Sequence, residues 1–549
     1  MKRLHLAWLA LWLLSPWSFS APADEPVRRL PVREYRDKMK AGWIGQIIGV
    51  SWGAPTEGRF QTIMPLEKMP PFSEDLVNGA FGQDDLYVEM TFLRSMEQYG
   101  FDVSIRQAGI DFANSRYPLW CANAAGRSNL RNAIAPPDSS HPEFHNCAGA
   151  IDYQIESDFA GLIAPGMPQI VIGLGEKFGR LMNYGDGMYA GQFMGAMYAE
   201  AFFETDPMHL IEAGLRAIPE RSMYAEMVRD MVRWRRENPD QWEKTWALAE
   251  KKYNQDRNYN ISALDVKREG AWVLMGLLYG NGDLDQTMII STRCGFDSDC
   301  NPSSSGGVLF TSRGLSRLPD RYYKRLDEKS VFSHTAYSFP ALVSVCEKLA
   351  RQAMTKAGAR IERDAQGEEV FVIPVCAPRP SAFEDLKKPG PVAASRYSPE
   401  EMAKITAGLK FEVQEFAPGW KLENCGRDMD PGLKDRWGGK TKVFVTHPLD
   451  RTTGCAFTRT VEIPAGKQTA LRLEVGRHPK GDWLLVVRAD GRELLRKPVD
   501  KTTAQNGWLT AEVDLSPLAG KPAKLELVNQ PTGWSYEAGY WATIAIAER

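Results

Sequence analysis

The spacing of apolar residues changes along this 549-residue chain, and that change limits the possible folds more than any single motif does. Between residues 32 and about 375, apolar side chains recur three and four positions apart, as in helices that bury one face. Beyond residue 408, short runs of alternating apolar residues are separated by turn residues, at the intervals typical of a β-sandwich. The sequence therefore predicts a multidomain protein: an all-α domain over 30–375, a Pro-rich linker over 376–407, and a β-sandwich over 408–549.

The first twenty residues have the composition of an export signal. Lys2 and Arg3 are followed by an apolar stretch, 4–14, and then by the small residues of 18–20. This order is that of a cleavable signal peptide, and the apolar stretch is too short for a membrane span. We therefore predict a periplasmic or secreted protein with a signal peptide over 1–20 and no integral membrane segment.

Charge and cysteine content narrow the possible partners. The net charge is −2 and the chain has no long basic run, which argues against nucleic acid as a partner. Eight cysteines lie beyond the signal, and an exported protein can pair them, although no Cys-x-x-Cys metal pattern is present. Cys425 and Cys455 are the first candidates for a disulfide, while Cys294 and Cys300 flank an acidic motif. Nothing in the sequence indicates an oligomeric state.

That acidic motif occupies residues 293–301, where Asp297 and Asp299 stand two positions apart with Ser298 and Asn301 beside them. A small polar segment directly after an apolar run predicts a turn that holds two carboxylates close together. Such carboxylates raise each other's pKa unless a cation lies between them. Carboxylate, amide and hydroxyl oxygens are ligands suited to Mg²⁺ or Ca²⁺. Taken alone, the motif fits an acidic surface turn as well as a metal site.

A predicted helix near residue 32 carries glycines along one face and leads to an acidic residue, Glu57. Each glycine costs about 0.5–1 kcal/mol relative to alanine inside a helix, so several together indicate that another helix or a ligand approaches closely. The residues concerned are Gly42, Gly45, Gly49 and Gly53.

A second acidic pair, Asp84 and Asp85, stands where helical spacing begins at Leu86. The first turn of a helix favours negative charge, so an N-terminal cap with no chemistry explains the pair equally well. Glu89, however, lies one turn beyond Asp85 on the same predicted face, which a cap does not require.

Two further segments are richer in polar residues than an ordinary linker, and we expect them to contribute to a pocket. For each residue taken singly, a plain surface loop remains the alternative. The candidates for substrate binding in these segments are Asn123, His141, Asp152, Glu156, Asp158, Asn183 and Asp186.

Taken together, three of these motifs resemble those of the ADP-ribosylglycohydrolase (DraG-like) family over about residues 33–330. Their order along the chain is more specific than any one of them. The motifs are Gly45-x3-Gly49-x3-Gly53-Ala54-Pro55-x-Glu57, Asp84-Asp85 at a helix start, and Gly295-x-Asp297-x-Asp299 before a helix.

The resemblance implies an all-α catalytic domain with one or two Mg²⁺ ions at the bottom of a cleft, where Mn²⁺ or Ca²⁺ is an alternative. Asp84, Asp85, Asp297 and Asp299 match the metal ligands of the family. Glu57, or one of Asp85 and Asp297, matches the catalytic carboxylate that assists hydrolysis at the anomeric carbon.

This sequence departs from the family pattern at two positions. Gln83 stands where the family has threonine before the Asp pair, and Cys300 stands where it has threonine after the second motif. A thiol is a poor ligand for Mg²⁺, so Asn301 or Ser298 is expected to supply oxygen instead, with Glu89 as an additional ligand. Gln83 and Asn301 are also candidates to bind substrate.

The leading functional prediction is a metal-dependent glycoside hydrolase acting on an extracytoplasmic carbohydrate. The export signal, the altered pocket motifs and the sandwich favour it; the last resembles a jelly-roll, galactose-binding-like carbohydrate-binding domain. In that domain Trp437 and Trp534, each next to a glycine, are the candidates for an exposed aromatic platform. Two alternatives remain: a hydrolase of ADP-ribosyl groups, and a non-catalytic sugar-binding protein on the same fold.

Overall fold

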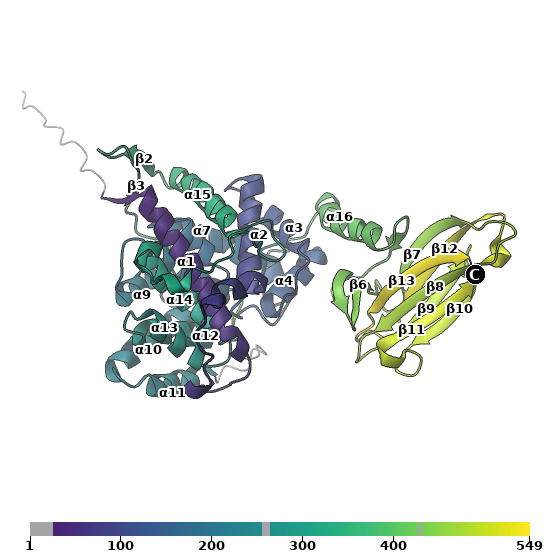
Figure 1. Ribbon diagram of the computed structural model, residues 1–549, viewed down its shortest axis with the longest axis horizontal. Coiled ribbons are helices and arrows are strands. Elements are labelled where there is room, and N and C mark those ends of the chain that lie inside the picture. Colours follow the sequence, from purple (N-terminus) through teal and green to yellow (C-terminus); the bar gives the residue numbers. More distant parts are fainter. Residues whose placement is uncertain (1–25, 255–263, 427–428, 430, 549) are drawn as a thin grey trace, which may run out of the picture.

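The computed structural model describes residues 26–254, 264–426, 429 and 431–548 (Figure 1). The predicted signal peptide therefore lies outside the described residues. Within them, no helix is both long enough and apolar enough to cross a membrane. The chain forms a helical domain followed by a domain of two antiparallel sheets, as the change in apolar spacing predicted.

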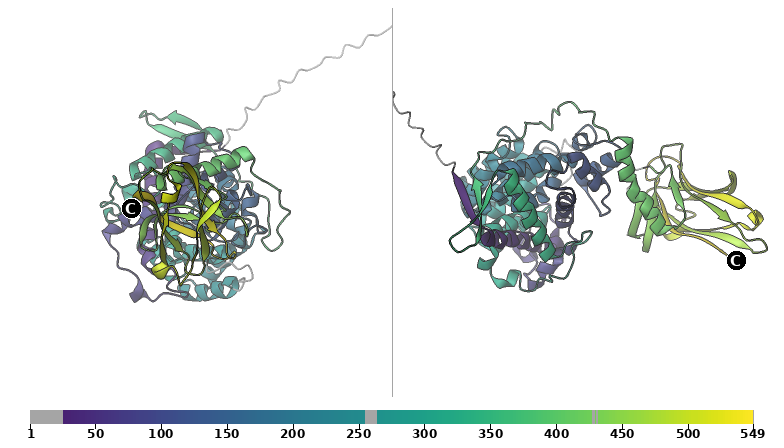
Figure 2. Two further views of the ribbon diagram at one scale, coloured as in Figure 1. Left: turned by 90° about the vertical axis from the view of Figure 1, so that its right-hand side faces the viewer. Right: turned by 90° about the horizontal axis from the view of Figure 1, so that it is seen from above.

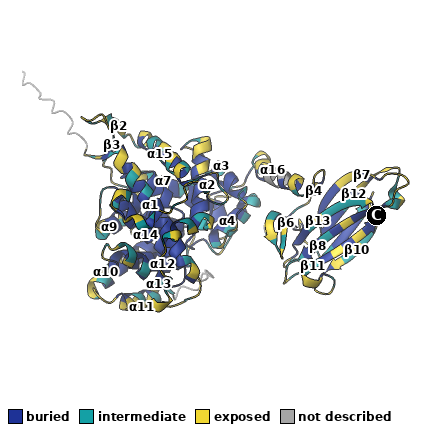
Figure 3. Cartoon of the chain, viewed as in Figure 1, coloured by how far each residue is buried: buried dark blue, intermediate teal, exposed yellow. Residues whose placement is uncertain are grey.

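The helical domain is built around α1, which runs through its centre with most of its residues buried (Figure 3). Helix α14 packs along α1, and the remaining helices surround this pair. The helices are α1 (Val32–Gly53), α2 (Asp84–Tyr99), α3 (Ile105–Ala113), α4 (Cys121–Arg131), α5 (Asp152–Ile155), α6 (Asp158–Leu162), α7 (Pro168–Phe178), α8 (Asp186–Ala201), α9 (Pro207–Arg216), α10 (Met223–Glu237), α11 (Trp242–Tyr253), α12 (Val266–Tyr279), α13 (Leu284–Arg293), α14 (Cys300–Arg313) and α15 (Phe339–Lys356).

The glycines of α1 allow α14 to approach at backbone distance. A Cβ added at Gly45 would lie 2.6 Å from the carbonyl oxygen of Gly306, and one at Gly49 would lie 2.3 Å from that of Pro302. At Gly53 the distance to the carbonyl oxygen of Ser298 would be 2.0 Å. The close approach predicted from the glycine pattern is therefore confirmed, and α14 is the partner.

One part of the domain is not helical. Strands β1 (Val27–Pro31), β3 (Glu369–Pro374) and β2 (Arg360–Arg363) form an antiparallel sheet in the order β1-β3-β2. The sequence predicted the helical domain but not this small sheet, because the N-terminal strand pairs with a hairpin more than 300 residues later and local spacing cannot reveal such a pairing.

The second domain is a sandwich of two five-stranded antiparallel sheets. One sheet has the order β10-β9-β12-β7-β4 and the other β11-β8-β13-β6-β5. Trp483 and Trp541 are fully buried between them and belong to the core. The strands are β4 (Lys421–Glu423), β5 (Gly432–Trp437), β6 (Lys440–Thr446), β7 (Cys455–Glu462), β8 (Thr469–Arg477), β9 (Trp483–Ala489), β10 (Arg492–Val499), β11 (Trp508–Asp514), β12 (Pro522–Gln530) and β13 (Gly539–Glu548).

A helix, α16 (Pro399–Phe416), lies between the two domains (Figure 2). The predicted boundary between linker and sandwich at residues 407 and 408 falls inside this helix. The Pro-rich composition upstream led to a predicted linker that extends into this helix. The helix begins at a capping box formed by Ser398 and Glu401.

Contacts from both domains converge on α16. Arg106 on α3 pairs with Glu401, its Nε lying 2.7 Å from Oε1. Arg116 lies 2.8 Å from Glu412 Oε1, and the other oxygen of Glu412 accepts a hydrogen bond from the backbone of Leu433 on β5. The carboxylate of Glu412 on α16 therefore contacts both Arg116 of the helical domain and strand β5 of the sandwich.

The α1–α14 contact can be tested with Gly49→Ala. Because the new methyl group would overlap the backbone at Pro302, we expect a loss of about 1–3 kcal/mol in the free energy of unfolding. Urea denaturation followed by circular dichroism measures it. The matched control is Gly173→Ala on α7, an exposed helical position with nothing within 4 Å of the added atom. There alanine should be neutral or stabilise by about 0.5–1 kcal/mol. Equal effects of the two variants would contradict the assigned packing.

Candidate active site

The C-terminal end of α1 and the N-terminal ends of α2 and α14 converge on a cavity of about 210 Å³. Carboxylate, amide and thiol side chains line it together with aromatic and apolar ones. The lining residues are Glu57, Gly82, Gln83, Asp84, Tyr87, Trp120, Cys121, Asn123, Ile151, Asp152, Ile155, Leu264, Asp297, Asp299 and Cys300. Among these described residues there is no lysine, arginine or histidine.

The turn that carries Asp297 and Asp299 is held in a strained conformation. Gly295 and Phe296 both have positive φ, 82° and 60°, and the second of these is costly for a residue with a side chain. The backbone N–H of Phe296 donates to the carbonyl of Phe60 at 2.7 Å, and its own carbonyl accepts from Gly58 N at 3.0 Å. These bonds fix the turn against the segment that follows α1.

A buried ion pair between Arg268 and Glu269 packs against the same turn. Arg268 donates from Nε and Nη2 to Glu269 Oε1 at 3.2 and 3.1 Å, and its guanidinium lies 3.8 Å from the centre of the Phe296 ring. The other oxygen of Glu269 accepts a hydrogen bond from Asn301 Nδ2 at 2.8 Å. Asn301 is therefore engaged with Glu269 and orients the start of α14.

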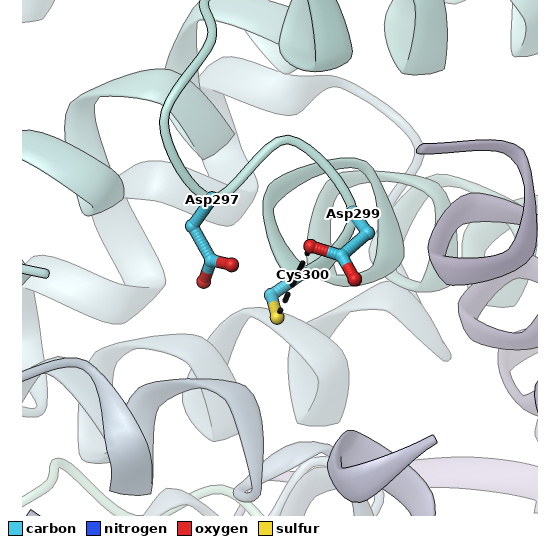
Figure 4. Close-up of side chains that lie close together, drawn as sticks. All are labelled: Asp297, Asp299 and Cys300. Atoms are coloured by element: carbon cyan, nitrogen blue, oxygen red, sulfur yellow. Dashed lines mark hydrogen bonds between the residues drawn. The ribbon is translucent and has the colours of Figure 1, made fainter. Parts of the chain in front are cut away.

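Three side chains of the acidic motif point toward a common centre (Figure 4). One ligand atom each from Asp297, Asp299 and Cys300 lies within 4.8 Å of the others. Asp84 lines the same cavity from the first turn of α2. Glu57 stands at the rim, exposed to solvent and close enough to Asp84 for their charges to interact.

Burial and mutual repulsion disfavour the charged forms of these acids. Burial and the neighbouring Glu57 raise the pKa of Asp299 to about 7. Burial, with Asp84 and Asp299, holds the pKa of Asp85 well above its usual range. Asp297 is shifted in the same direction by burial and by Asp299. The described surroundings thus leave the cluster short of positive charge.

Asp85 is the buried carboxylate whose surroundings most clearly indicate a cation site. Its side chain is fully buried, yet neither carboxylate oxygen has a hydrogen-bond partner within the described residues. One carboxylate oxygen of Asp297, Oδ2, is likewise buried without a hydrogen-bond partner within the described residues. Buried polar atoms without partners are costly, and a cation among hard carboxylate oxygens would satisfy them. The residues present therefore fit a divalent cation such as Mg²⁺.

Cys300 belongs to the same cluster as Asp297 and Asp299. Burial and the charges of these two acids raise the pKa of its thiol well above the usual range. The thiol donates to Asp299 Oδ1 at a distance of 3.8 Å. The soft sulfur of Cys300 matches Mg²⁺ less well than the neighbouring carboxylate oxygens do.

Three of the residues predicted to bind substrate line the cavity: Gln83, Asn123 and Asp152. Asp152 accepts backbone hydrogen bonds from Ala122 and Asn123 at 3.3 and 2.8 Å, which places the N-terminus of α4 at the cavity wall. Burial, opposed by these hydrogen bonds, leaves the pKa of Asp152 at about 7.

Glu89, Glu156 and Asp158 lie buried outside the cavity lining, as do Asp85 and Asn301. Glu89, predicted as a metal ligand, accepts hydrogen bonds from Gln46 Nε2 at 2.6 Å and from the backbone of Phe159 at 2.9 Å, and so connects α2 to α1 and α6. Glu156 accepts from Asn123, and Asp158 accepts from the hydroxyl of Tyr198 at 2.7 Å. Their contacts join helices and do not face the cavity.

His141, Asn183 and Asp186, which the sequence predicts to bind substrate, do not line this cavity. The ring of His141 is hydrogen-bonded to the carbonyl of Gly390 at 2.9 Å, in a separate surface hollow. Asn183 donates to the carbonyls of Ala148 and Ala150, and Asp186 accepts from the backbone of Tyr224. Each is hydrogen-bonded to a backbone group, a role that composition alone does not distinguish from ligand binding.

Sequence reasoning missed the aromatic and apolar part of the wall. Trp120 is 58% exposed at the mouth of the cavity, and Tyr87 lies one turn after Asp84 on α2. The helical spacing from Asp84 could have indicated Tyr87. Nothing local marks Trp120 or Cys121, whose thiol is in hydrogen-bonding contact with Cys147.

The chain is similar to one known protein family and to several solved structures. The sequence profile described as ADP-ribosylglycohydrolase matches residues 31–359, more than half of the chain. A solved structure titled "ADP-ribosylglycohydrolase-related protein complex" is 14% identical, covering 59% of this chain and 100% of its own, with a TM-score of 0.38.

Two other solved structures match shorter parts of the chain. A cyclase from Fischerella sp. TAU is 10% identical over 24% of this chain and 74% of its own, and CBM35 from Paenibacillus barcinonensis is 14% identical over 24% and 94%; both have a TM-score of 0.18. A comparison with curated proteins found no match.

The carboxylate cluster predicts how stability depends on pH in the presence of a chelator. An acid whose pKa is raised on folding binds more protons in the folded state, so its contribution is complete below its unfolded pKa and is lost as pH rises. For Asp299 that loss should run from about pH 4 to about pH 7.

We therefore expect the melting temperature in EDTA to fall across this interval more steeply for the native chain than for Asp299→Asn. Differential scanning fluorimetry at pH 4–8 measures both. Parallel curves for the two proteins would contradict the assignment of Asp299 to a repelling cluster.

Proposed function

Because this chain belongs to the ADP-ribosylglycohydrolase family, we propose that it hydrolyses a glycosyl bond at the carboxylate cavity with the aid of a divalent cation. Asp84, Asp85, Asp297 and Asp299 would hold the cation, with Mg²⁺ the best match to hard oxygen ligands. The observation that carries the proposal is Asp85, a fully buried carboxylate with two unpartnered oxygens beside three other acids.

The chain's own residues supply the remaining parts of a hydrolytic site. A bound cation would position sugar hydroxyls and lower the pKa of water. Glu57 stands at the rim, where burial and the charge of Asp84 raise its pKa toward the range useful for a general base. It would accept a proton from the water whose oxygen bonds to the anomeric carbon. The bond to the leaving oxygen would break, and that oxygen would take a proton from bulk water as the leaving group departs. The apolar wall at Ile151, Ile155 and Leu264 would exclude other water.

For the substrate we propose a carbohydrate outside the cytoplasm. The export signal expected from residues 1–20 supports this location, and the sandwich domain supports a polymeric ligand. Hydrolysis of an ADP-ribosyl bond is the second candidate, and the observation that favours it is family membership itself.

Asp297→Asn and Asp84→Asn should each lower kcat by at least about 100-fold, because each removes a charge that the cation requires. Circular dichroism should show an unchanged fold, since asparagine has the same shape. Asp240→Asn is the matched control: Asp240 is exposed in the loop after α10 and should keep full activity when changed. Activity of either cavity variant equal to that of the control would remove that residue from the site.

A metal titration provides a test that needs no substrate. We expect Mg²⁺ or Mn²⁺ at 100 times its Kd to stabilise the chelated protein by about 2.7 kcal/mol, seen as a rise in melting temperature. Asp85→Asn should abolish the rise. If Mg²⁺, Mn²⁺ and Ca²⁺ all leave the melting curve of the native chain unchanged, the site holds no cation.

The substrate class can be decided by a screen of aryl glycosides alongside ADP-ribosyl-arginine, with Mg²⁺ and with EDTA. We expect Mg²⁺-dependent release of the aryl group from at least one glycoside. Release of ADP-ribose alone would instead establish the second candidate. Turnover that persists in EDTA would contradict the role assigned to the cation.

A further inference from the structure

A groove of about 510 Å³ lies between the helical domain and the sandwich. One wall comes from α4 and the residues just before it, and the other comes from β5, β6 and β13. The lining residues are Arg116, Pro118, Leu119, Trp120, Ala124, Arg127, Ser128, Arg131, Met429, Lys434, Arg436, Trp437, Val445 and Tyr540.

The groove and the carboxylate cavity share one lining residue. Trp120 belongs to the lining of the cavity and also to the helical wall of the groove. The two hollows therefore lie next to the same exposed tryptophan.

The sizes of the two hollows favour a ligand that occupies both. Pockets for small molecules usually measure about 300–1,000 Å³, and the carboxylate cavity alone, at about 210 Å³, falls below that range. The groove is more than twice as large. The cavity thus suits the reacting unit of a substrate, and the rest of a longer substrate would lie in the groove.

The sandwich wall presents an aromatic surface in a fixed position. Trp437 stacks on Tyr540, with ring centres 4.3 Å apart and planes 6° from parallel, and Tyr540 is buried in the sandwich. Trp437 itself is only half-buried and lines the groove. A rigid, partly exposed aromatic pair costs little entropy when it binds a flat apolar face, such as the C–H face of a pyranose ring.

The two walls are held relative to one another by α16. Arg116, a groove residue, pairs with Glu412, and the same carboxylate accepts the backbone N–H of Leu433 on the strand that ends at Trp437. The distance between the walls is therefore set by a direct contact as well as by the connecting chain.

We propose that this groove binds the sugar units of a carbohydrate chain that adjoin the unit in the carboxylate cavity, with Trp120 and Trp437 stacking against them. The proposal rests on the proposed glycosidase function and adds that the substrate is an oligosaccharide or polysaccharide. Polar donors such as Arg436, exposed on β5, would hydrogen-bond the hydroxyl groups.

The test separates binding from catalysis by using the full chain with Asp297→Asn. Native electrophoresis through gels that contain xylan, polygalacturonate, galactomannan or laminarin measures affinity as retardation. We expect retardation in at least one gel, and at least a tenfold loss of affinity when Trp120→Ala or Trp437→Ala is added. Trp120 is exposed, so its variant keeps the fold even if the loss of Trp437 disturbs β5.

Trp534→Ala is the matched control. Trp534 is a half-buried tryptophan of the same sandwich that packs against His447 and does not line the groove. Its variant should be retarded like the parent. No retardation in any gel, or equal loss in all three tryptophan variants, would overturn the proposal. Because the parent of this series is inactive by design, retardation without any hydrolysis by the native chain would disprove the glycosidase function and leave the groove established.

Discussion

The contact between the backbones of α1 and α14 is the constraint on which the rest of the site depends. Glycines at 45, 49 and 53 remove the side chains that would separate the two helices, and the last of them lies against the carbonyl of Ser298. The acidic turn therefore begins where α1 ends, beside Glu57 and opposite the first turn of α2. A larger residue at Gly53 would press directly against the turn at Ser298, so close packing here is also a requirement on the geometry of the carboxylates.

This arrangement concentrates negative charge where the protein offers little to balance it. The nearest buried guanidinium, that of Arg268, is paired with Glu269 and stacked on Phe296, so it orders the turn without neutralising Asp297. Burying such a cluster has a cost in stability. A cation bound among these carboxylates would remove that repulsion, and its affinity would be higher for that reason.

The sequence identified the parts of the site that are encoded locally. Asp84 with Asp85 and Asp297 with Asp299 stand in short motifs, and the glycine spacing of α1 has one simple physical explanation. His141, Asn183 and Asp186 were predicted to bind substrate but do not line the cavity, because a polar side chain can bind a backbone group as readily as a ligand and sequence does not reveal its partner. The strand pairing of β1 and the position of Trp120 depend on segments far apart in the chain, and no spacing pattern carries that information. The capping box at Ser398 and Glu401 encodes the beginning of α16, but the Pro-rich composition before it led to the prediction of a linker instead.

The position of α16 has a consequence for how this protein can be divided. A carbohydrate-binding module is ordinarily portable: cut from its enzyme, it keeps its affinity. Here the groove belongs to neither domain alone, because its two walls come from different domains and Glu412 contacts both. Either half expressed alone would lack one wall of the groove, so under the proposed function the excised sandwich would bind carbohydrate more weakly than the intact chain. The unit of recognition would then be the junction of the two domains.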